Sequence, residues 1–185
     1  MNTQQHNKIT IGVLIGVMVF QALCLAWEFM NGGVVTHHFL MRKDLPGVSN
    51  WWGLVILPVL VLCTSYSIKK RAANHAGGQS KFYRNVCIAF SAMLLVSVAQ
   101  STVFSLGYHE VAMFVLLGLI LAALVFPLHR LECVLGYVLG STFFTGPAMP
   151  FVGVVIFSVV SILVHLCIKP LISKGIRSRK EALPR

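Results

Sequence analysis

The sequence has few charged residues, and acidic residues are the scarcest of them. Of 185 residues only 11% are charged, with five Asp and Glu against 15 Lys and Arg, while 57% are hydrophobic. A soluble domain averages about 25% charged residues, so this composition argues against one. Apolar runs of about 20 residues, long enough to cross a hydrocarbon core of about 30 Å, recur along the chain. We therefore expect a polytopic membrane protein.

The best-known signatures of nucleotide-driven transport and of hydrolysis are also missing. The sequence contains no P-loop, no GxGxxG, no GxSxG and no HExxH motif. Its five cysteines include no CxxC pair and no pair that indicates an external disulfide, so we interpret them as small apolar fillers. The net charge of +10 lies in short runs between apolar segments, where it would set topology, and we expect no nucleic-acid partner.

The apolar runs predict an all-α integral membrane bundle of six transmembrane helices, which forms a single domain over residues 1–185. The expected helices cover about 9–30, 51–68, 86–106, 111–128, 133–145 and 151–168. The apolar run 133–168 is too long for one crossing, and the turn-forming segment 145–150, with Gly146, Pro147 and Pro150, divides it. The polar linker 72–85 is expected to be a solvated loop.

The positions of Lys and Arg predict which side of the membrane each loop faces. With six helices, all of the 15 basic residues except Arg42 and Lys43 fall on one side. Basic residues favour the cytoplasmic side, so both termini are predicted to be cytoplasmic, including a basic tail at 169–185. Residues 31–50 then form an ordered outer loop. From the compact size and the lack of an organelle signal we expect a bacterial plasma membrane.

This topology gathers acidic and histidine residues at the outer face. Glu28 is the sharpest case, because an ionisable group at the edge of a spanning helix usually faces a partner or a water-filled cavity. Gln21, Cys24 and Glu28 share one face of the first helix, and a second polar stripe on the third helix comprises Ser97, Gln100, Ser101, Ser105 and Tyr108. The two stripes predict a polar cavity between these helices. Alternatively, Glu28 is an interfacial carboxylate and the stripes are hydrogen-bonding contacts between helices.

Two sets of candidate site residues follow. The candidate catalytic residues, which would supply acid/base groups or metal ligands, are Glu28, His37, His38, Asp44, His109 and Glu110. The candidate substrate-binding residues, which would line the entry to the site, are Gln21, Asn50, Trp51, Trp52, Gln100 and Tyr108. An aromatic belt at the membrane interface also explains the tryptophans without any function.

His37, His38 and His109 are candidate metal ligands. Zinc would need three or four N, O or S ligands at about 2.0–2.3 Å, whereas copper(I) would recruit thioethers such as those of Met30 or Met41. The sequence has none of the standard metal spacings, so the histidines could equally hydrogen-bond within the loop or act as acid/base groups. The cofactor therefore stays open, with a divalent metal such as zinc, or copper, as the candidate.

Three hypotheses of function remain open. The first is a membrane-embedded enzyme that acts on a lipid or other amphiphile at the outer leaflet. The second is a transporter or metal-handling protein, which needs polar groups in the cytoplasmic half, where His129, Glu132 and His165 are the main candidates. The third is a non-catalytic subunit or assembly factor whose outer loop docks a partner. Expected partners are membrane lipids and a second copy, through the small-residue faces Gly12-xxx-Gly16 and Gly136-xxx-Gly140.

Overall fold

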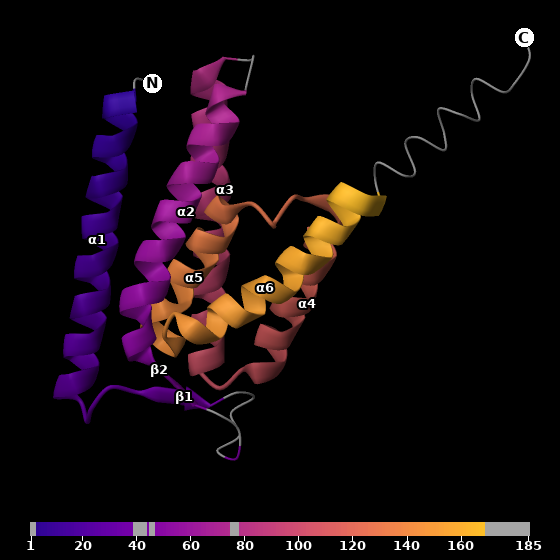
Figure 1. Cartoon of the computed structure of the whole chain (residues 1–185). Helices are drawn as coiled ribbons and strands as arrows, with labels where there is room; N and C mark the ends of the chain where they lie inside the picture. The colour runs from indigo at the N-terminus through magenta and orange to yellow at the C-terminus, as the bar shows by residue number, and fades with distance from the viewer. Residues whose placement is uncertain (1–2, 39–43, 45–46, 75–77, 169–185) are drawn as a thin grey trace, which may run out of the picture.

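The computed structural model describes residues 3–38, 44, 47–74 and 78–168. Its helices run alternately in opposite directions and form one bundle (Figure 1). They are α1 Thr3–Met30, α2 Gly53–Ala73, α3 Gln79–Ser105, α4 His109–Val125, α5 Leu131–Thr145 and α6 Ala148–Ile162, which continues as a π-helical turn, η3 Leu163–Ile168. The start of α1 and the end of η3 lie toward the same end of the bundle, here named the terminal end.

A short β-hairpin marks the opposite end, here named the hairpin end. Strands β1 Thr36–His38 and β2 Gly47–Ser49 pair antiparallel, with Thr36 opposite Ser49 and His38 opposite Gly47. The chain can leave α1 sharply because Gly32 and Gly33 adopt positive φ angles of 120° and 106°. A 3-10 turn, η2 Asn50–Trp52, then leads into α2. The outer loop expected at 31–50 therefore contains a small sheet.

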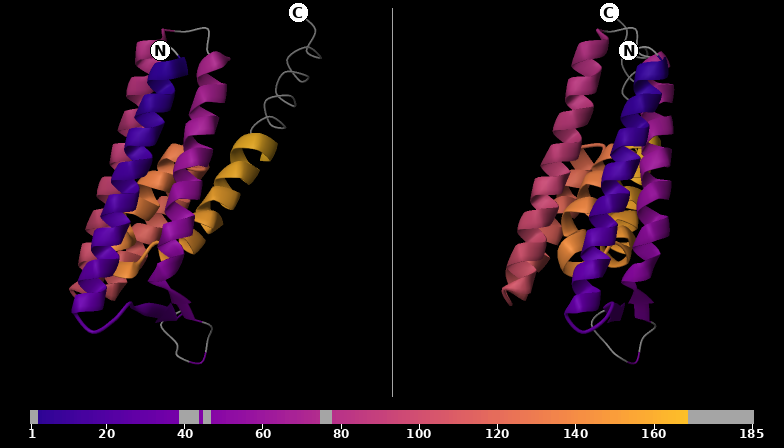
Figure 2. Two further views of the ribbon diagram at one scale, coloured as in Figure 1. Left: turned by 60° about the vertical axis from the view of Figure 1, so that its left-hand side comes forward. Right: turned by 90° about the vertical axis from the view of Figure 1, so that its left-hand side faces the viewer.

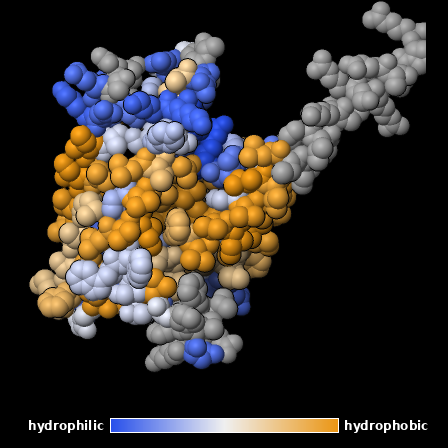
Figure 3. Space-filling model, viewed as in Figure 1, coloured by the Kyte–Doolittle hydropathy of each residue, from blue (hydrophilic) through white to orange (hydrophobic). Residues whose placement is uncertain are grey.

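Four of the helices are long and apolar enough to cross a membrane. They cover Gln4–Met30, Asn50–Ala73, Gln79–Ser105 and Ala148–Leu166, while α4 and α5 are apolar but have only 17 and 15 residues. Figure 3 shows a broad hydrophobic belt between polar residues at the two ends. The all-helical bundle is therefore confirmed, and its four long apolar helices indicate a membrane protein, whereas six crossings and the cytoplasmic location of the termini stay predictions.

The polar linker expected at 72–85 is largely helical. Helix α2 continues to Ala73 and α3 begins at Gln79, well before the predicted start near residue 86. Basic residues such as Lys81 and Arg84 are compatible with a helix that extends beyond the apolar belt. The change from apolar to polar residues therefore shows where the apolar belt ends, while the helix itself continues. As a result, α2 and α3 reach farther at the terminal end than the connection between α4 and α5 does (Figures 1 and 2).

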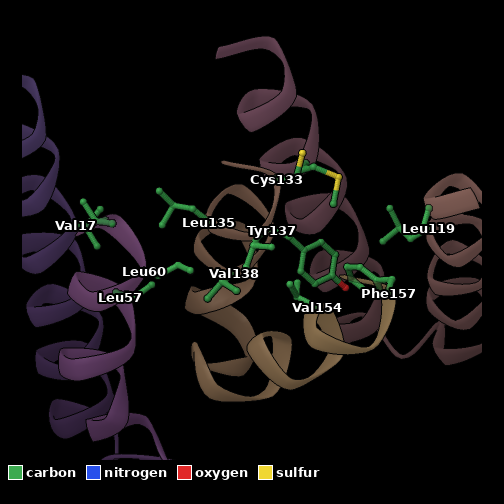
Figure 4. Close-up of a cluster of buried hydrophobic side chains, with 14 residues drawn as sticks. Val17, Leu57, Leu60, Leu119, Cys133, Leu135, Tyr137, Val138, Val154 and Phe157 are labelled. Atoms are coloured by element: carbon green, nitrogen blue, oxygen red, sulfur yellow. The ribbon is translucent and has the colours of Figure 1, made fainter. Parts of the chain in front are cut away.

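Helix α5 is the centre of the bundle. Ten of its 15 residues are buried, and it packs against α2, α3 and α6. The contact with α3 is the closest: a Cβ atom on Gly136 would overlap the Phe90 carbonyl oxygen, and one on Gly140 would overlap that of Leu94. Figure 4 shows side chains of α5, including Leu135, Tyr137 and Val138, between those of the surrounding helices. The Gly136-xxx-Gly140 face is thus an internal contact.

Helix α1 lies at the edge of the bundle and packs along α2. The Ser65 hydroxyl of α2 lies 2.6 Å from the Thr10 hydroxyl and 2.9 Å from His6 Nε2. Among the described residues, nothing lies within 4 Å of the position that a Cβ atom would take at Gly12 or Gly16. A second copy packing on this face stays a prediction.

Gly136→Ala should destabilise the bundle by about 1–3 kcal/mol, because the added methyl group overlaps backbone atoms of α3, which cannot rotate away. We expect a lower midpoint of thermal unfolding in detergent, followed by size-exclusion chromatography after heating. Gly118→Ala in α4 is the matched control, because nothing in the described chain lies within 4 Å of that Cβ position. The control should be neutral or slightly stabilising, and equal midpoints for both variants would contradict the close α3–α5 packing.

Candidate functional site

Three of the predicted outer-face residues, Gln21, Glu28 and Asn50, form one hydrogen-bonded network, here named the hairpin joint. Asn50 Nδ2 donates to Glu28 Oε1 at 2.5 Å, and the backbone N–H of Val35 donates to Glu28 Oε2 at 3.0 Å. Gln21 Nε2 donates to the Asn50 carbonyl at 3.2 Å, and Asn50 N–H donates to the Val35 carbonyl at 3.1 Å. Both carboxylate oxygens of Glu28 therefore accept bonds that fasten the hairpin to α1.

The hairpin joint is closed by close packing. Gln21 is 1% exposed and Asn50 is 3% exposed. The Gln21 amide lies beside Gly53 and Pro147, and the Asn50 amide lies against Gly146, which adopts a φ of 65° at the end of α5. No larger residue fits at Gly53 or Gly146 without moving these amides. The joint is therefore a structural connection between α1, the hairpin and the α5–α6 turn, with little space for a substrate.

His37 is a predicted site residue whose pKa is influenced by Glu28 of the hairpin joint. It is half-buried in β1, and burial lowers its pKa from the ordinary value of 6.5, while the negative charge of Glu28 acts in the opposite direction. His38 follows it in β1 and pairs with Gly47 through the backbone. Asp44 lies in a turn and is exposed. A role for these residues in catalysis is left as a prediction.

The other predicted site residues lie apart from the hairpin joint. His109 and Glu110 are exposed at the start of α4, where the His109 ring stacks edge-on against Phe104 with a centroid distance of 4.7 Å. Gln100 accepts a hydrogen bond from the Tyr137 hydroxyl at 2.8 Å and donates to the Ala112 carbonyl at 3.2 Å. Tyr108, Trp51 and Trp52 are exposed at the hairpin end.

The polar cavity expected between the first and third helices is wrong. Gln100 and Ser97 of α3 bond to α4 and α5, and the polar stripe of α1 faces η2. A groove of about 490 Å³ does lie between α1 and the α3–α5 pair, but its lining is apolar, with Val13, Phe20 and Leu94 among the contributors. Gln21, Ser97 and Gln100 of the two stripes hydrogen-bond to other elements, as the alternative interpretation expected.

No metal centre forms in the part of the chain that the structure describes. Within it, no three His, Cys, Asp or Glu side chains lie close enough to hold one ion. His37 and His109 belong to separate elements with different neighbours. The proposal of zinc or copper at the outer face therefore has no geometric support among these residues.

A second groove, here named the α2–α6 groove, has polar residues within a mainly apolar lining. It has a volume of about 540 Å³ and lies where α2 and α6 diverge over α5 (Figure 1). Its apolar walls include Val55 and Val59 of α2 and Val155 and Val159 of α6. Trp52 lies at the hairpin end of its lining. Its polar lining residues are Cys63, His129 and Ser158.

Histidines at the terminal end hold α6 to the end of α4. His129 Nδ1 lies 3.1 Å from Ser161 Oγ, and Ser161 Oγ donates to the Phe126 carbonyl at 3.3 Å. His165 places Nδ1 3.0 Å from the Ser161 carbonyl and Nε2 3.1 Å from the Val125 carbonyl. The sequence pointed to His129 and His165 only as polar groups in the cytoplasmic half.

A buried ion pair lies nearby, at the start of α5. Glu132 is 1% exposed, and its Oε2 lies 2.6 Å from the Arg71 guanidinium of α2. Glu132 Oε1 and Arg71 Nε have no hydrogen-bond partner among the described residues. Sequence reasoning counted Arg71 among the topology-setting charges and did not predict this pair. The position of Glu132, directly before an apolar run, was the feature of the sequence that could have indicated a buried ion pair.

Comparison with models of known protein families, with curated proteins and with solved structures finds no match to this chain. Its function must therefore be argued from the geometry described above.

The titration of His37 should follow the burial of its ring. We expect a midpoint below 6.5 in a histidine NMR titration in detergent, and Glu28→Gln should lower it further, because the carboxylate stabilises the imidazolium. Stability contributed by neutral His37 is complete above pH 6.5 and is lost as the pH falls through the folded pKa. Glu110→Gln, at an exposed acid on α4, should leave the midpoint unchanged. A midpoint insensitive to Glu28 would show that the two groups do not interact.

The two partners of the buried ion pair should respond unequally to mutation. Arg71→Met leaves the Glu132 carboxylate buried and unpaired, so we expect a loss of about 3–5 kcal/mol in unfolding free energy. Glu132→Gln should cost less, because the Arg71 side chain is 29% exposed and can turn to water. The measurement is thermal unfolding of both variants and of the double variant. Additive effects in the double variant would argue against the pair.

Proposed function

We propose that this protein binds a lipid or another amphiphile in the α2–α6 groove. The observation that carries the proposal is the groove itself. Its lining is mostly apolar but also contains the polar residues Cys63, His129 and Ser158. Its volume falls within the range of about 300–1,000 Å³ found for small-molecule sites. A molecule with an apolar tail and a polar head matches this distribution, whereas a free ion or a polar solute does not.

The alternatives have less support from the geometry. Transport requires polar groups along the whole path, but the hairpin joint and the terminal-end histidines are separated by an apolar core that includes Leu57, Val138 and Phe157. A membrane-embedded enzyme remains part of the proposal, with His129 as the acid/base group beside a bound headgroup. The predicted outer-face set around Glu28 and His109 is not gathered in one place, so we place the binding site in the groove.

Filling the groove should release the bound amphiphile. Val155→Trp introduces a bulky ring into the groove wall, while Ile156→Trp places the same ring at nearly the same depth on a part of α6 outside the groove. We expect the first variant to lose most co-purified lipid in native mass spectrometry, with the second retaining wild-type levels. Equal retention by both variants would mean that the bound lipid lies elsewhere.

A further inference from the structure

The contacts of His129 favour one of its two neutral tautomers. Both contacts of Ser161 Oγ are hydrogen bonds at once only when it donates to the Phe126 carbonyl and accepts from His129 Nδ1, and we assign the tautomer on that basis. Nε2 then carries a lone pair when the ring is neutral, and it makes no hydrogen bond within the described chain. Burial lowers the pKa of His129, and the neighbouring His165 and Arg130 lower it further, while Glu132 acts in the opposite direction. The groove therefore contains a hydrogen-bond acceptor.

Ser158 supplies the complementary group. It lines the same groove, and its hydroxyl is buried without a hydrogen-bond partner among the described residues. Ser158 lies three residues before Ser161, which places it about 4.5 Å along the helix axis from the partner of His129. One rotation about χ1 can turn its hydroxyl, which donates one bond and accepts another. An acceptor and an unsatisfied hydroxyl thus lie within about one helical turn.

The described lining of the α2–α6 groove includes no Lys or Arg that could pair with an anionic headgroup. Arg71 is already paired with Glu132, and Arg130, which follows His129 in the chain, is exposed and is not among the lining residues. A phosphate monoester or diester has no hydrogen to donate to His129 Nε2 in its fully ionised form. A neutral alcohol can donate to Nε2 and accept from Ser158, so it satisfies both groups at once.

From these contacts we infer that the α2–α6 groove selects an uncharged lipid with a free hydroxyl headgroup, bound by His129 Nε2 and Ser158 Oγ. This inference rests on the proposed function, because it names the class of amphiphile that the groove takes. A diacylglycerol or a long-chain alcohol has this chemistry.

Two free cysteines allow a test on the unmodified protein. Cys63 lines the groove, whereas Cys87 of α3 is exposed outside it. The protein is placed in phosphatidylcholine nanodiscs that contain dioleoylglycerol, its O-methyl ether or phosphatidic acid. Labelling of each cysteine by a lipophilic maleimide is then followed by peptide mass spectrometry. We expect dioleoylglycerol to protect Cys63 but not Cys87, with about three- to tenfold weaker protection by the ether, because the ether lacks the donor hydrogen.

Two variants test whether His129 and Ser158 cause the preference for alcohol over ether. His129→Phe keeps a ring of similar size but removes the acceptor, so it should abolish the preference for alcohol over ether, and Ser158→Ala should reduce it. Equal protection by alcohol and ether, or stronger protection by phosphatidic acid, would overturn the inference while leaving lipid binding in the groove intact. No protection of Cys63 by any of the three lipids would overturn the proposed function as well. The wild-type comparison of the three lipids decides the matter even if a variant fails to fold.

Discussion

Helix α5 can approach α3 closely only because two glycines, one turn apart, leave space for its backbone. At Gly136 and Gly140 the carbonyl oxygens of Phe90 and Leu94 occupy the positions that side chains would need. Beside this contact, Ser97 Oγ of α3 donates a hydrogen bond to the Tyr137 carbonyl oxygen of α5 at 2.5 Å, which helps to orient α5. Because α2 and α6 pack against α5, the groove between them depends on the same approach. In lipid, where apolar burial gives little driving force between helices, such close packing is a principal source of association.

The polar residues at the hairpin end connect the hairpin to α1 through a carboxylate and two amides. Glu28 accepts from the Val35 backbone and from Asn50, and Gln21 supports the Asn50 carbonyl. A hairpin of three residues per strand has few internal bonds, so its position is determined by these contacts with α1. The buried amide oxygens of Gln21 and Asn50 lack partners among the described residues, which identifies the joint as tightly packed but incompletely satisfied.

Much of the fold was predictable from hydrophobicity alone. All six helices were expected near their observed positions, and Gly146 and Pro147 correctly marked the break between α5 and α6. The early start of α3 was missed because Lys81 and Arg84 are polar, although a helix can extend beyond the apolar belt. The site was harder to predict. Gln21, Glu28 and Asn50 do come together, but His109 and Glu110 lie elsewhere, because topology assigns residues to one end of a bundle and not to neighbouring positions on it. The ion pair between Arg71 and Glu132 could not be predicted, because it depends on how far α2 is shifted along its axis relative to α5. Hydrophobic periodicity does not give this shift.

The difference in length between the helices has a consequence for the surrounding bilayer. An α5 of 15 residues spans about 22 Å, whereas α2 and α3 continue past it at the terminal end. The continuing parts of α2 and α3 carry basic residues such as Lys70 and Lys81, so in a bilayer they would lie at the level of the lipid headgroups, beyond the acyl chains.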